Sequence, residues 1–414
     1  MNTRRVVITG LGCVTALAES ADGLFDALCE GKSGISLVDV FDTTDFSAKI
    51  GGQIRDFDIK KYISSRIAKR MDRFTRMAMA SAIQAVTDSG LEPEKEDCNR
   101  IGCIIGTGIG GIQEIEDQHE RLRVKGPRKV SAFCVPKLMG NAASGCVSIH
   151  YGFKGPNMCI VTACASAANA IGEAFYNIRS GRSDVMVTGG SEAALTPVAL
   201  ASFCSLKSLS TDNNNPTGAS RPFDASRNGF VLSEGAGILI LEEYEHAKKR
   251  DAKIYCELLG YGATGDGYHI TAPNPDGDGA ARAMRNALNV AGVLPEKLDY
   301  INAHGTSTTL NDIAESKAIR TVLGNYAYNV PVSSTKSCLG HLLGASGAVE
   351  MIVIAKTIEK SAIPPTINLN KVDKQCDPKM DFVPNEARNL RVNIAMSNSL
   401  GFGGHNCCLV AGKI

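Results

Sequence analysis

The sequence predicts an α/β fold, in which short buried strands alternate with helices. Short apolar runs alternate with stretches that carry apolar residues at helical spacing, and 42 glycines are distributed among them. Alternation of strands and helices is typical of α/β proteins. With 414 residues, the chain is long enough for two typical domains or for one large duplicated unit.

Eight apolar runs are predicted as strands and three periodic stretches as helices. The predicted strands cover residues 5–9, 101–105, 158–162, 185–188, 238–241, 300–303, 332–335 and 392–397. The first helix, 165–180, has apolar residues at 167, 170, 171, 174, 175 and 178 and stops before Gly181. The second, 311–323, stops before Gly324, and the third covers 345–359.

The charged helical stretch 242–253 is the best candidate for a seam between two parts of the chain. We therefore predict an N-terminal unit, residues 1–250, and a C-terminal unit, residues 251–414. No internal repeat is visible in the sequence. A duplication, if there is one, has diverged beyond detection from a single sequence.

Composition excludes several classes of function. Apolar residues make up 44% of the chain and charged residues 21%, as in an ordinary globular protein. The formal net charge is +1, so no overall field favours nucleic acid or a membrane surface. No apolar run approaches the ~20 residues of a membrane-spanning helix. We expect neither a nucleic acid nor a membrane as partner.

The N-terminus and the cysteines bear on the compartment. Near the start only Val6, Val7 and Ile8 run together as apolar residues, whereas an export signal needs about 7–15. The 14 cysteines form no C-x-x-C pair and are interpreted as thiols of a reducing compartment. We expect a cytoplasmic protein, or one of the plastid stroma if a transit peptide has been removed.

One glycine motif resembles a cofactor loop. Gly106, Gly108 and Gly111 satisfy G-x-G-x-x-G directly after a predicted strand. A dinucleotide site also needs an acidic residue about 20 positions further on, and the sequence there reads RKVSAFCVP. A tight turn beside a substrate tunnel is the favoured interpretation, and a cofactor loop the weaker one.

A cysteine lies where a predicted strand passes into a helix. Cys164 follows the strand at 158–162 and is flanked by the small residues Ala163, Ala165 and Ser166. Free N–H groups and the helix dipole at a helix start favour an anion, so we expect a lowered thiol pKa. The Cys164 N–H is also placed to stabilise an oxyanion. Taken alone, Cys164 is better interpreted as one more buried cysteine.

Three further turns carry reactive groups after predicted strands. His304 stands in NAHGTST, Lys336 and His341 in STKSCLGHLLG, and Phe402 between glycines in GFGG. Ligands of α/β folds bind beyond the carboxyl ends of strands, so these turns can meet at one site. Zinc held by Cys–His–His is an alternative, disfavoured because the ligands lie far apart in sequence and Lys336 would repel a cation.

Together these motifs resemble the β-ketoacyl-acyl carrier protein synthases, and among them the elongating enzymes, closest to synthase II. The likeness rests on TACAS, NAHGTST, STKSCLGHLLGASG and NSLGFGG, and it extends through RRVVITGLG, RMDRFT, GTGIGG, RPFD and SEGAG. It implies a thiolase-like fold of two similar halves in five α-β-α-β-α layers, a homodimer, and no cofactor. It also implies condensation of a Cys-bound acyl group with malonyl-acyl carrier protein in fatty-acid elongation.

The resemblance implies a role for each residue of the motifs. Cys164 carries the acyl group, the N–H groups of Cys164 and Phe402 stabilise the oxyanion, and Phe402 gates the site. His304 and His341 hydrogen-bond the enolate, and Lys336 tunes charge near His341. Other residues would hold the phosphopantetheine arm (Thr271, Thr306, Thr308) or line the acyl tunnel (Ile109, Phe203, and Phe133 from the partner subunit).

Two surface or structural sites are implied more weakly. A basic landing patch for the acidic carrier protein would comprise Lys69, Arg70, Arg128, Lys129 and Lys207. A structural monovalent cation would be held by Asn302, Glu350, Ser397 and Asn398. The chain departs from many family members at Leu400 and His405, which flank the gate.

Three other functions stay open at this stage. A discrete polyketide ketosynthase would use the same chemistry on a different acyl chain. A thiolase would need a second catalytic cysteine, for which Cys407 and Cys408 are candidates. A non-catalytic subunit that only binds carrier protein would acquire no acyl adduct.

Overall fold

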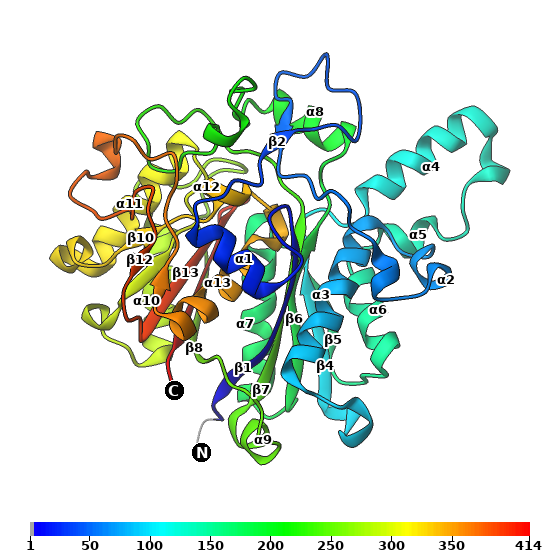
Figure 1. Cartoon of the computed structure of the whole chain (residues 1–414), viewed down its shortest axis with the longest axis horizontal. Helices are drawn as coiled ribbons and strands as arrows, with labels where there is room; N and C mark the ends of the chain where they lie inside the picture. Colours follow the sequence, from blue (N-terminus) through cyan, green and yellow to red (C-terminus); the bar gives the residue numbers. More distant parts are fainter. Residues whose placement is uncertain (1–3) are drawn as a thin grey trace.

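The computed structural model describes residues 4–414, whose main strands fall into two equivalent sets (Figure 1). The first set is β1 (Val6–Thr15), β4 (Ile101–Gly106), β5 (Asn157–Ile160), β6 (Val185–Glu192) and β7 (Gly235–Glu243). The second is β8 (Cys256–Gly265), β9 (Tyr300–Asn302), β10 (Val332–Ser333), β13 (Ile394–Gly401) and β14 (His405–Gly412).

Both sets have the same topology. Their spatial orders are β5-β4-β6-β7-β1 and β10-β9-β13-β14-β8, which coincide once each set is numbered along the chain. In each set three neighbouring strands run parallel and the next two are added antiparallel. A short antiparallel contact between β1 and β8, from Val6↔Leu258 to Ile8↔Cys256, joins the sets. The chain is therefore built from two similar halves.

Helices separate and cover these halves. α7 (Ser166–Arg179) and α13 (Ser346–Lys360) contact strands of both sets, so they form a shared middle layer. α3 (Arg73–Ser89) and α6 (Ala142–Tyr151) cover the outer face of the first set, and α10 (Asp278–Ala291) and α11 (Thr309–Leu323) that of the second. This confirms the five-layered arrangement that the resemblance implied.

Glycines in the first strand of each half let the outer helix pack against the backbone. A Cβ on Gly10 or Gly12 would come within 2.2 or 2.1 Å of a carbonyl oxygen of α3. Gly260 and Gly262 of β8 meet carbonyl oxygens of α10 in the same way, each at 2.2 Å. The two halves thus repeat one strand–helix contact.

The remaining elements surround this core. The other helices are α1 (Ala21–Cys29), α2 (Ser65–Ala68), α4 (Ile112–Lys125), α5 (Cys134–Leu138), α8 (Pro197–Ser205), α9 (Tyr244–Lys249) and α12 (Lys336–Leu339). Two small hairpin-like pairs are β2 (Ser36–Leu37) with β3 (Ile50–Gly51), and β11 (Ala362–Ile363) with β12 (Arg388–Asn389). Figure 1 shows α4 standing out from the body of the molecule.

The eight predicted strands and three predicted helices are all present, with shifted ends. β8 and β14, in which glycine or paired cysteines interrupt the apolar pattern, were not predicted, and neither were the two-residue strands β2, β3, β11 and β12. The stretch predicted as a seam contains the end of β7 and all of α9, before β8 starts. The proposed units remain residues 1–250 and 251–414.

Two features of the described chain concern its environment. No helix within residues 4–414 is both long and apolar enough to span a bilayer. The 14 cysteines are all free thiols.

Candidate active site

One cavity of about 520 Å³ lies beyond the carboxyl ends of parallel strands from both halves. It is lined by groups from all four turns that the sequence singled out. Ten predicted residues contribute to its wall: Ile109, Cys164, Phe203, Lys207, Thr271, His304, Thr306, Thr308, His341 and Phe402. The structure thus brings together residues that are distant in sequence, while Lys336 lies buried behind the wall.

Local hydrogen bonds hold Cys164 in a tight turn. The chain leaves β5 at Ile160 and makes one 3₁₀ turn, Ala163–Ala165, before α7 begins. Ser166 Oγ accepts a hydrogen bond from the Thr162 N–H (2.9 Å) and donates one to the Ala163 carbonyl (2.6 Å). Ala163 has a positive φ of 48°, which a residue with a Cβ adopts only under constraint. The turn therefore presents the thiol in a defined direction.

The predicted lowering of the Cys164 pKa is wrong for this state of the site. The side chain is buried, and burial raises the pKa of the thiol to about 12. Lys336 and the N–H groups of Phe402 and Cys164 act in the opposite direction but do not outweigh burial. A helix dipole contributes about 2 kcal/mol at most, roughly 1.5 pKa units. At neutral pH the thiol is therefore protonated.

The loop after β13 brings a backbone N–H group, that of Phe402, to the sulfur of Cys164. The Phe402 N–H favours the thiolate of Cys164, as does the N–H of Cys164 itself, so both groups face the reacting atom. Gly401 packs on the same turn, because a Cβ there would lie 3.2 Å from the Cys164 nitrogen. Gly403 and Gly404 have φ of 82° and 73°, which explains the need for glycine. Two converging N–H groups are the geometry of an oxyanion hole.

A buried carboxylate holds His304 by its backbone. Glu315 of α11 accepts hydrogen bonds from the N–H groups of His304 and Gly305, both at 2.8 Å. Burial raises the pKa of Glu315 to about 7 despite these donors. The pKa of His304 is well below its usual value because of burial, Lys336 and His341. His304 is therefore a neutral imidazole in a fixed position.

His341 lies against His304 and is held at both ends. Its backbone N–H donates to the Val231 carbonyl (2.7 Å), and its ring Nδ1 is 3.0 Å from Ser346 Oγ. The His304 and His341 ring centroids are 5.2 Å apart, with the rings nearly perpendicular. Burial, aided by Lys336, also keeps the His341 pKa well below its usual value. Two neutral imidazoles therefore face the cavity together.

Lys336 supplies the positive charge of the site. It is 2% exposed and forms an ion pair with Glu350, which is equally buried. Its charge favours the thiolate of Cys164 and the neutral forms of His304 and His341. Lys336 thus influences all three groups.

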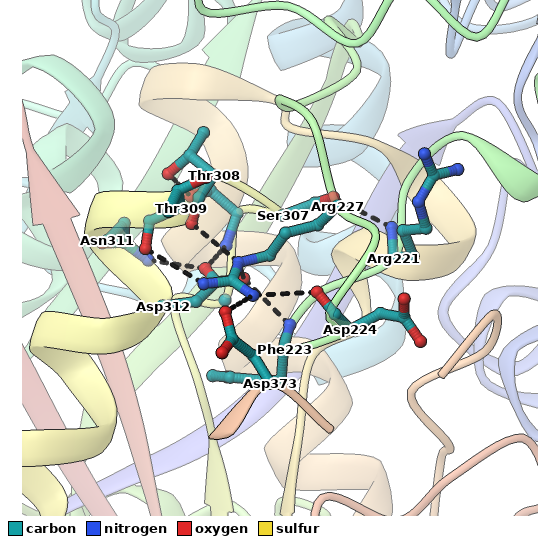
Figure 2. Close-up of polar contacts among 12 residues, drawn as sticks. Arg221, Phe223, Asp224, Arg227, Ser307, Thr308, Thr309, Asn311, Asp312 and Asp373 are labelled. Carbon is teal, nitrogen blue, oxygen red and sulfur yellow. Dashed lines mark hydrogen bonds and ion pairs between the residues drawn. The ribbon is translucent and has the colours of Figure 1, made fainter. Parts of the chain in front are cut away.

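A buried network fixes the loop that follows His304 (Figure 2). Asp312 accepts hydrogen bonds from the N–H groups of Thr306 (3.0 Å) and Phe223 (2.9 Å) and forms an ion pair with Arg227 at 3.3 Å. Arg227 also donates to the carbonyls of Thr308 and Thr309. The network orients the hydroxyls of Thr306 and Thr308, which are 2.9 Å apart at the cavity wall.

These supporting groups were not among the residues predicted from the sequence. Asp312 and Glu315 stand in the first two turns of the helix that follows NAHGTST, so their nearness to His304 was a usable signal. Glu192, at the end of β6, contacts two cavity loops and gave no such signal, because its partners are distant in sequence.

The remaining predicted substrate and carrier residues divide into two groups. Ile109, Phe203 and Thr271 lie at the cavity, whereas Phe133 is 43% exposed and does not line it. The five residues of the proposed carrier patch are all exposed: Lys69, Arg70, Arg128, Lys129 and Lys207. Lys207 is the member at the cavity mouth, and Arg70 lies over the Phe133 ring at 5.3 Å.

The predicted cation ligands do not all share one face of the sheet. Asn302 and Ser397 are paired across β9 and β13, and α13, which carries Glu350, packs on β13. Asn398 follows Ser397 and points to the opposite face, where its amide donates to Glu315 at 3.2 Å. Within residues 4–414, Asn302 Oδ1 and Glu350 Oε2 are buried without a hydrogen-bond partner. Asn398 thus separates from the other three.

Cys407 and Cys408 do not reach the cavity. Both are buried in β14, and Cys164 is the one cysteine among the described residues that lines the wall. No group of three or more His, Cys, Asp or Glu side chains within residues 4–414 is arranged to hold a metal ion.

Comparison with protein families and curated proteins gives consistent results. Residues 3–247 match the family described as "Beta-ketoacyl synthase, N-terminal domain", and residues 255–370 match its C-terminal domain. The protein named "3-oxoacyl-[acyl-carrier-protein] synthase 2" of Synechocystis sp. is 49% identical over 413 residues, covering 100% of this chain and 99% of that protein. The protein of the same name from Coxiella burnetii is 47% identical over 414 residues, covering 100% of both.

Solved structures share the fold over the whole length. The ketosynthase of a type II PKS, solved with its acyl-carrier protein, has a TM-score of 0.92 and 36% identity, with 100% of both chains covered. A beta-ketoacyl synthase from Burkholderia phymatum STM815 has a TM-score of 0.92 and 34% identity, covering 99% of this chain and 100% of that one.

Proposed function

The chain belongs to the β-ketoacyl synthase family, and we propose from this that it condenses a Cys-bound acyl group with malonyl-acyl carrier protein in fatty-acid elongation. The product is a β-ketoacyl-acyl carrier protein two carbons longer. The observation that carries the proposal is the convergence of Cys164, His304 and His341 on one cavity.

In the first step Cys164 takes the acyl group from its carrier. The thiol attacks the thioester carbonyl, and the N–H groups of Cys164 and Phe402 stabilise the oxyanion. Because the Cys164 thiol is protonated at rest, its proton must leave during the attack, and it ends on the departing phosphopantetheine thiol. A neighbouring neutral imidazole can carry this proton across the short gap.

In the second step malonyl-carrier protein enters and loses CO2. The electron pair of the broken C–C bond forms an enolate, which attacks the Cys164 thioester and expels the sulfur as a thiolate. The thiolate takes up a proton from solvent and returns to the resting thiol. Neutral imidazoles suit this step, because His304 and His341 can donate hydrogen bonds to a negative charge that exists only in passing. The hydroxyls of Thr306, Thr308 and Thr271 are suited to hold the phosphopantetheine arm.

The nucleophile is tested by replacing Cys164 with Ala. Wild-type protein mixed with acyl-carrier protein should gain one acyl mass at Cys164 and release product after malonyl-carrier protein is added. The C164A variant should do neither, while a C13A variant, which removes a buried thiol outside the cavity, should do both. Condensation at the wild-type rate in C164A would refute the assignment.

A polyketide ketosynthase is the second candidate, because the ketosynthase of a type II PKS shares the fold at 36% identity. The 49% identity to a 3-oxoacyl synthase favours fatty-acid elongation. Saturated acyl-carrier substrates separate the two: efficient elongation of these chains supports the first candidate. A thiolase is disfavoured, because it would need a second catalytic cysteine and neither Cys407 nor Cys408 reaches this cavity.

We also propose that the protein is a homodimer that binds acyl carrier protein through its exposed basic residues. β5 is an edge strand, and exposed apolar side chains lie in it (Met158), just after it (Val161) and on the adjacent helix α6 (Ile149). Such an edge is suited to pair with a second copy. In that dimer Phe133, which does not line its own cavity, would be available to the partner's tunnel.

Two minor proposals complete the picture. A monovalent cation at Asn302, Glu350 and Ser397 would satisfy the buried oxygens of the first two residues. A melting temperature that does not change between potassium and choline salts would speak against it. The free thiols fit a cytoplasmic location, which fractionation of cells would test.

A further inference from the structure

Glu192 is a buried carboxylate at the end of β6 that the mechanism leaves without a role. It is fully buried, and each of its oxygens accepts two hydrogen bonds. Oε2 accepts from the N–H groups of Gly108 (2.6 Å) and Gly344 (3.1 Å). Oε1 accepts from the Ile109 N–H (3.2 Å) and the Thr107 hydroxyl (3.1 Å). One side chain therefore holds a loop of the first half and a loop of the second.

Both loops line the cavity on its apolar side. Ile109 and Leu343 form part of the wall, and Leu343 packs with Cys164 in one apolar cluster. The loops lie so close that a Cβ on Gly344 would come 2.2 Å from the Gly108 nitrogen and 2.7 Å from Glu192 Oε2. Leu343 has a positive φ of 46°, so its backbone is constrained as well. The distance between Ile109 and Leu343 thus depends on the carboxylate between them.

Stability alone does not account for an acid at this position. Burial raises the pKa of Glu192 to about 7 in spite of four donors, so its ionised form opposes folding at neutral pH. The same charge disfavours the thiolate of Cys164. Ionisation of Glu192 thus works against the Cys164 thiolate, while the four hydrogen bonds that its side chain accepts tie two cavity loops together.

We propose that Glu192 is a positioning residue that holds the Ile109 and Leu343 loops together and thereby sets which acyl chain lengths Cys164 accepts. The inference rests on the proposed condensing function, because Ile109 and Leu343 contact substrate only if Cys164 carries an acyl chain.

The test measures acylation of Cys164 by hexanoyl-, decanoyl- and palmitoyl-carrier protein in wild type and in E192Q. Glutamine keeps the size but places an NH2 group against N–H donors, so the loops separate. The ratio of kcat/KM between the best and worst chain should shrink by about tenfold or more, the size expected when a buried hydrogen bond to a charged group is lost. T107V removes one donor without touching the acid and should shift the profile in the same direction by less.

E242Q is the matched control. Glu242 is equally buried but lies opposite Val185, at the other end of β6. The E242Q substitution should therefore lower stability and leave the chain-length profile unchanged. If E192Q acylates every chain more slowly by one common factor, Glu192 is merely structural and the proposal fails. If wild type forms no adduct with any chain, the proposed condensing function fails instead.

Discussion

The reacting groups of this site are held in neutral forms. Burial raises the pKa of the Cys164 thiol to about 12 and lowers that of both imidazoles well below their usual value. A neutral site suits a reaction in which negative charge appears only in the transition states. The permanent charges lie behind the cavity wall, on the buried ion pair of Lys336 and Glu350.

Removing the Lys336 charge should therefore raise the pKa values of both histidines. The double variant Lys336→Met with Glu350→Gln removes the two charges together, which avoids a buried unpaired ion. Because Lys336 holds the pKa of His304 and His341 down, the acid limb of the kcat/KM profile should move to higher pH. Measuring that profile, or the histidine signals by NMR, gives the answer.

A matched control for this prediction is Lys356→Met. Lys356 is an equally buried lysine on α13, paired with Asp22 and Glu359 outside the cavity. Loss of the Lys356 charge should leave the pKa values of His304 and His341 unchanged. Unchanged histidine pKa values in the double variant would show that the Lys336 charge does not reach the imidazoles.

At the scale of elements, the site depends on how loops after parallel strands are tied down. The loop after β9 has little regular structure, and it is held by Arg227, Asp312 and Glu315 (Figure 2 shows the first two). These ties come from outside the loop itself. The position of this loop is therefore fixed by side chains outside it, on α11 and at Arg227.

Arg227→Met should destabilise the protein strongly, since it leaves Asp312 buried without its cation. The expected loss is about 3–5 kcal/mol of unfolding free energy, as for other broken buried pairs, with a raised KM for malonyl-carrier protein. Denaturant unfolding and steady-state kinetics measure both. Arg388→Met breaks a half-exposed pair with Asp381 and should cost no more than about 1 kcal/mol. Equal losses of unfolding free energy in the two variants would contradict a special stabilising role of the buried Arg227–Asp312 pair.

The connection between the halves contains a pH-dependent contact. His246 of α9 lies 2.6 Å from Glu242 and 3.0 Å from Glu96, and these carboxylates raise its pKa. A raised pKa means that the contact stabilises the fold fully below the unfolded value of 6.5, while the carboxylates stay ionised. The stabilisation is lost as pH rises through the higher folded value.

His246→Gln should accordingly cost most stability in mildly acidic buffer and little in alkaline buffer. Paired unfolding curves of wild type and H246Q across this range would measure the difference. A difference that grew with pH would have the wrong sign for this contact.

At the scale of the whole molecule, the two halves share one topology and leave one sheet edge exposed. β5 ends the sheet, and Val161 beside it is 59% exposed. An apolar edge of this kind is typical of a surface that pairs with another chain.

Val161→Lys should therefore separate the proposed dimer. A buried lysine at the centre of an interface is costly, so sedimentation or light scattering should show a monomer, with weaker selection among long acyl chains if Phe133 serves the partner. Leu294→Lys, at a residue 65% exposed elsewhere, should leave the mass unchanged. A wild-type protein that is already monomeric would remove the proposal.

Sequence reasoning recovered the parts of the fold that local patterns encode. Strands with unbroken apolar runs and helices with clear periodicity were found, and the motifs around Cys164, His304 and His341 indicated their chemistry. The repeat was implied by the family likeness but was not visible in the residues, although Gly10 and Gly12 of β1 have counterparts in Gly260 and Gly262 of β8. Two glycine pairs are too weak a signal until the helices packed on them are seen.

By itself, the sequence determined the α/β class, the candidate reactive residues and the family likeness, because these depend on local periodicity and on short motifs. Tertiary structure decided the protonation of Cys164, the supporting roles of Glu315, Asp312 and Glu192, and the separation of Asn398 from its expected partners. Those properties arise from burial and from contacts between residues far apart in the chain, and both exist only once the two halves have packed together.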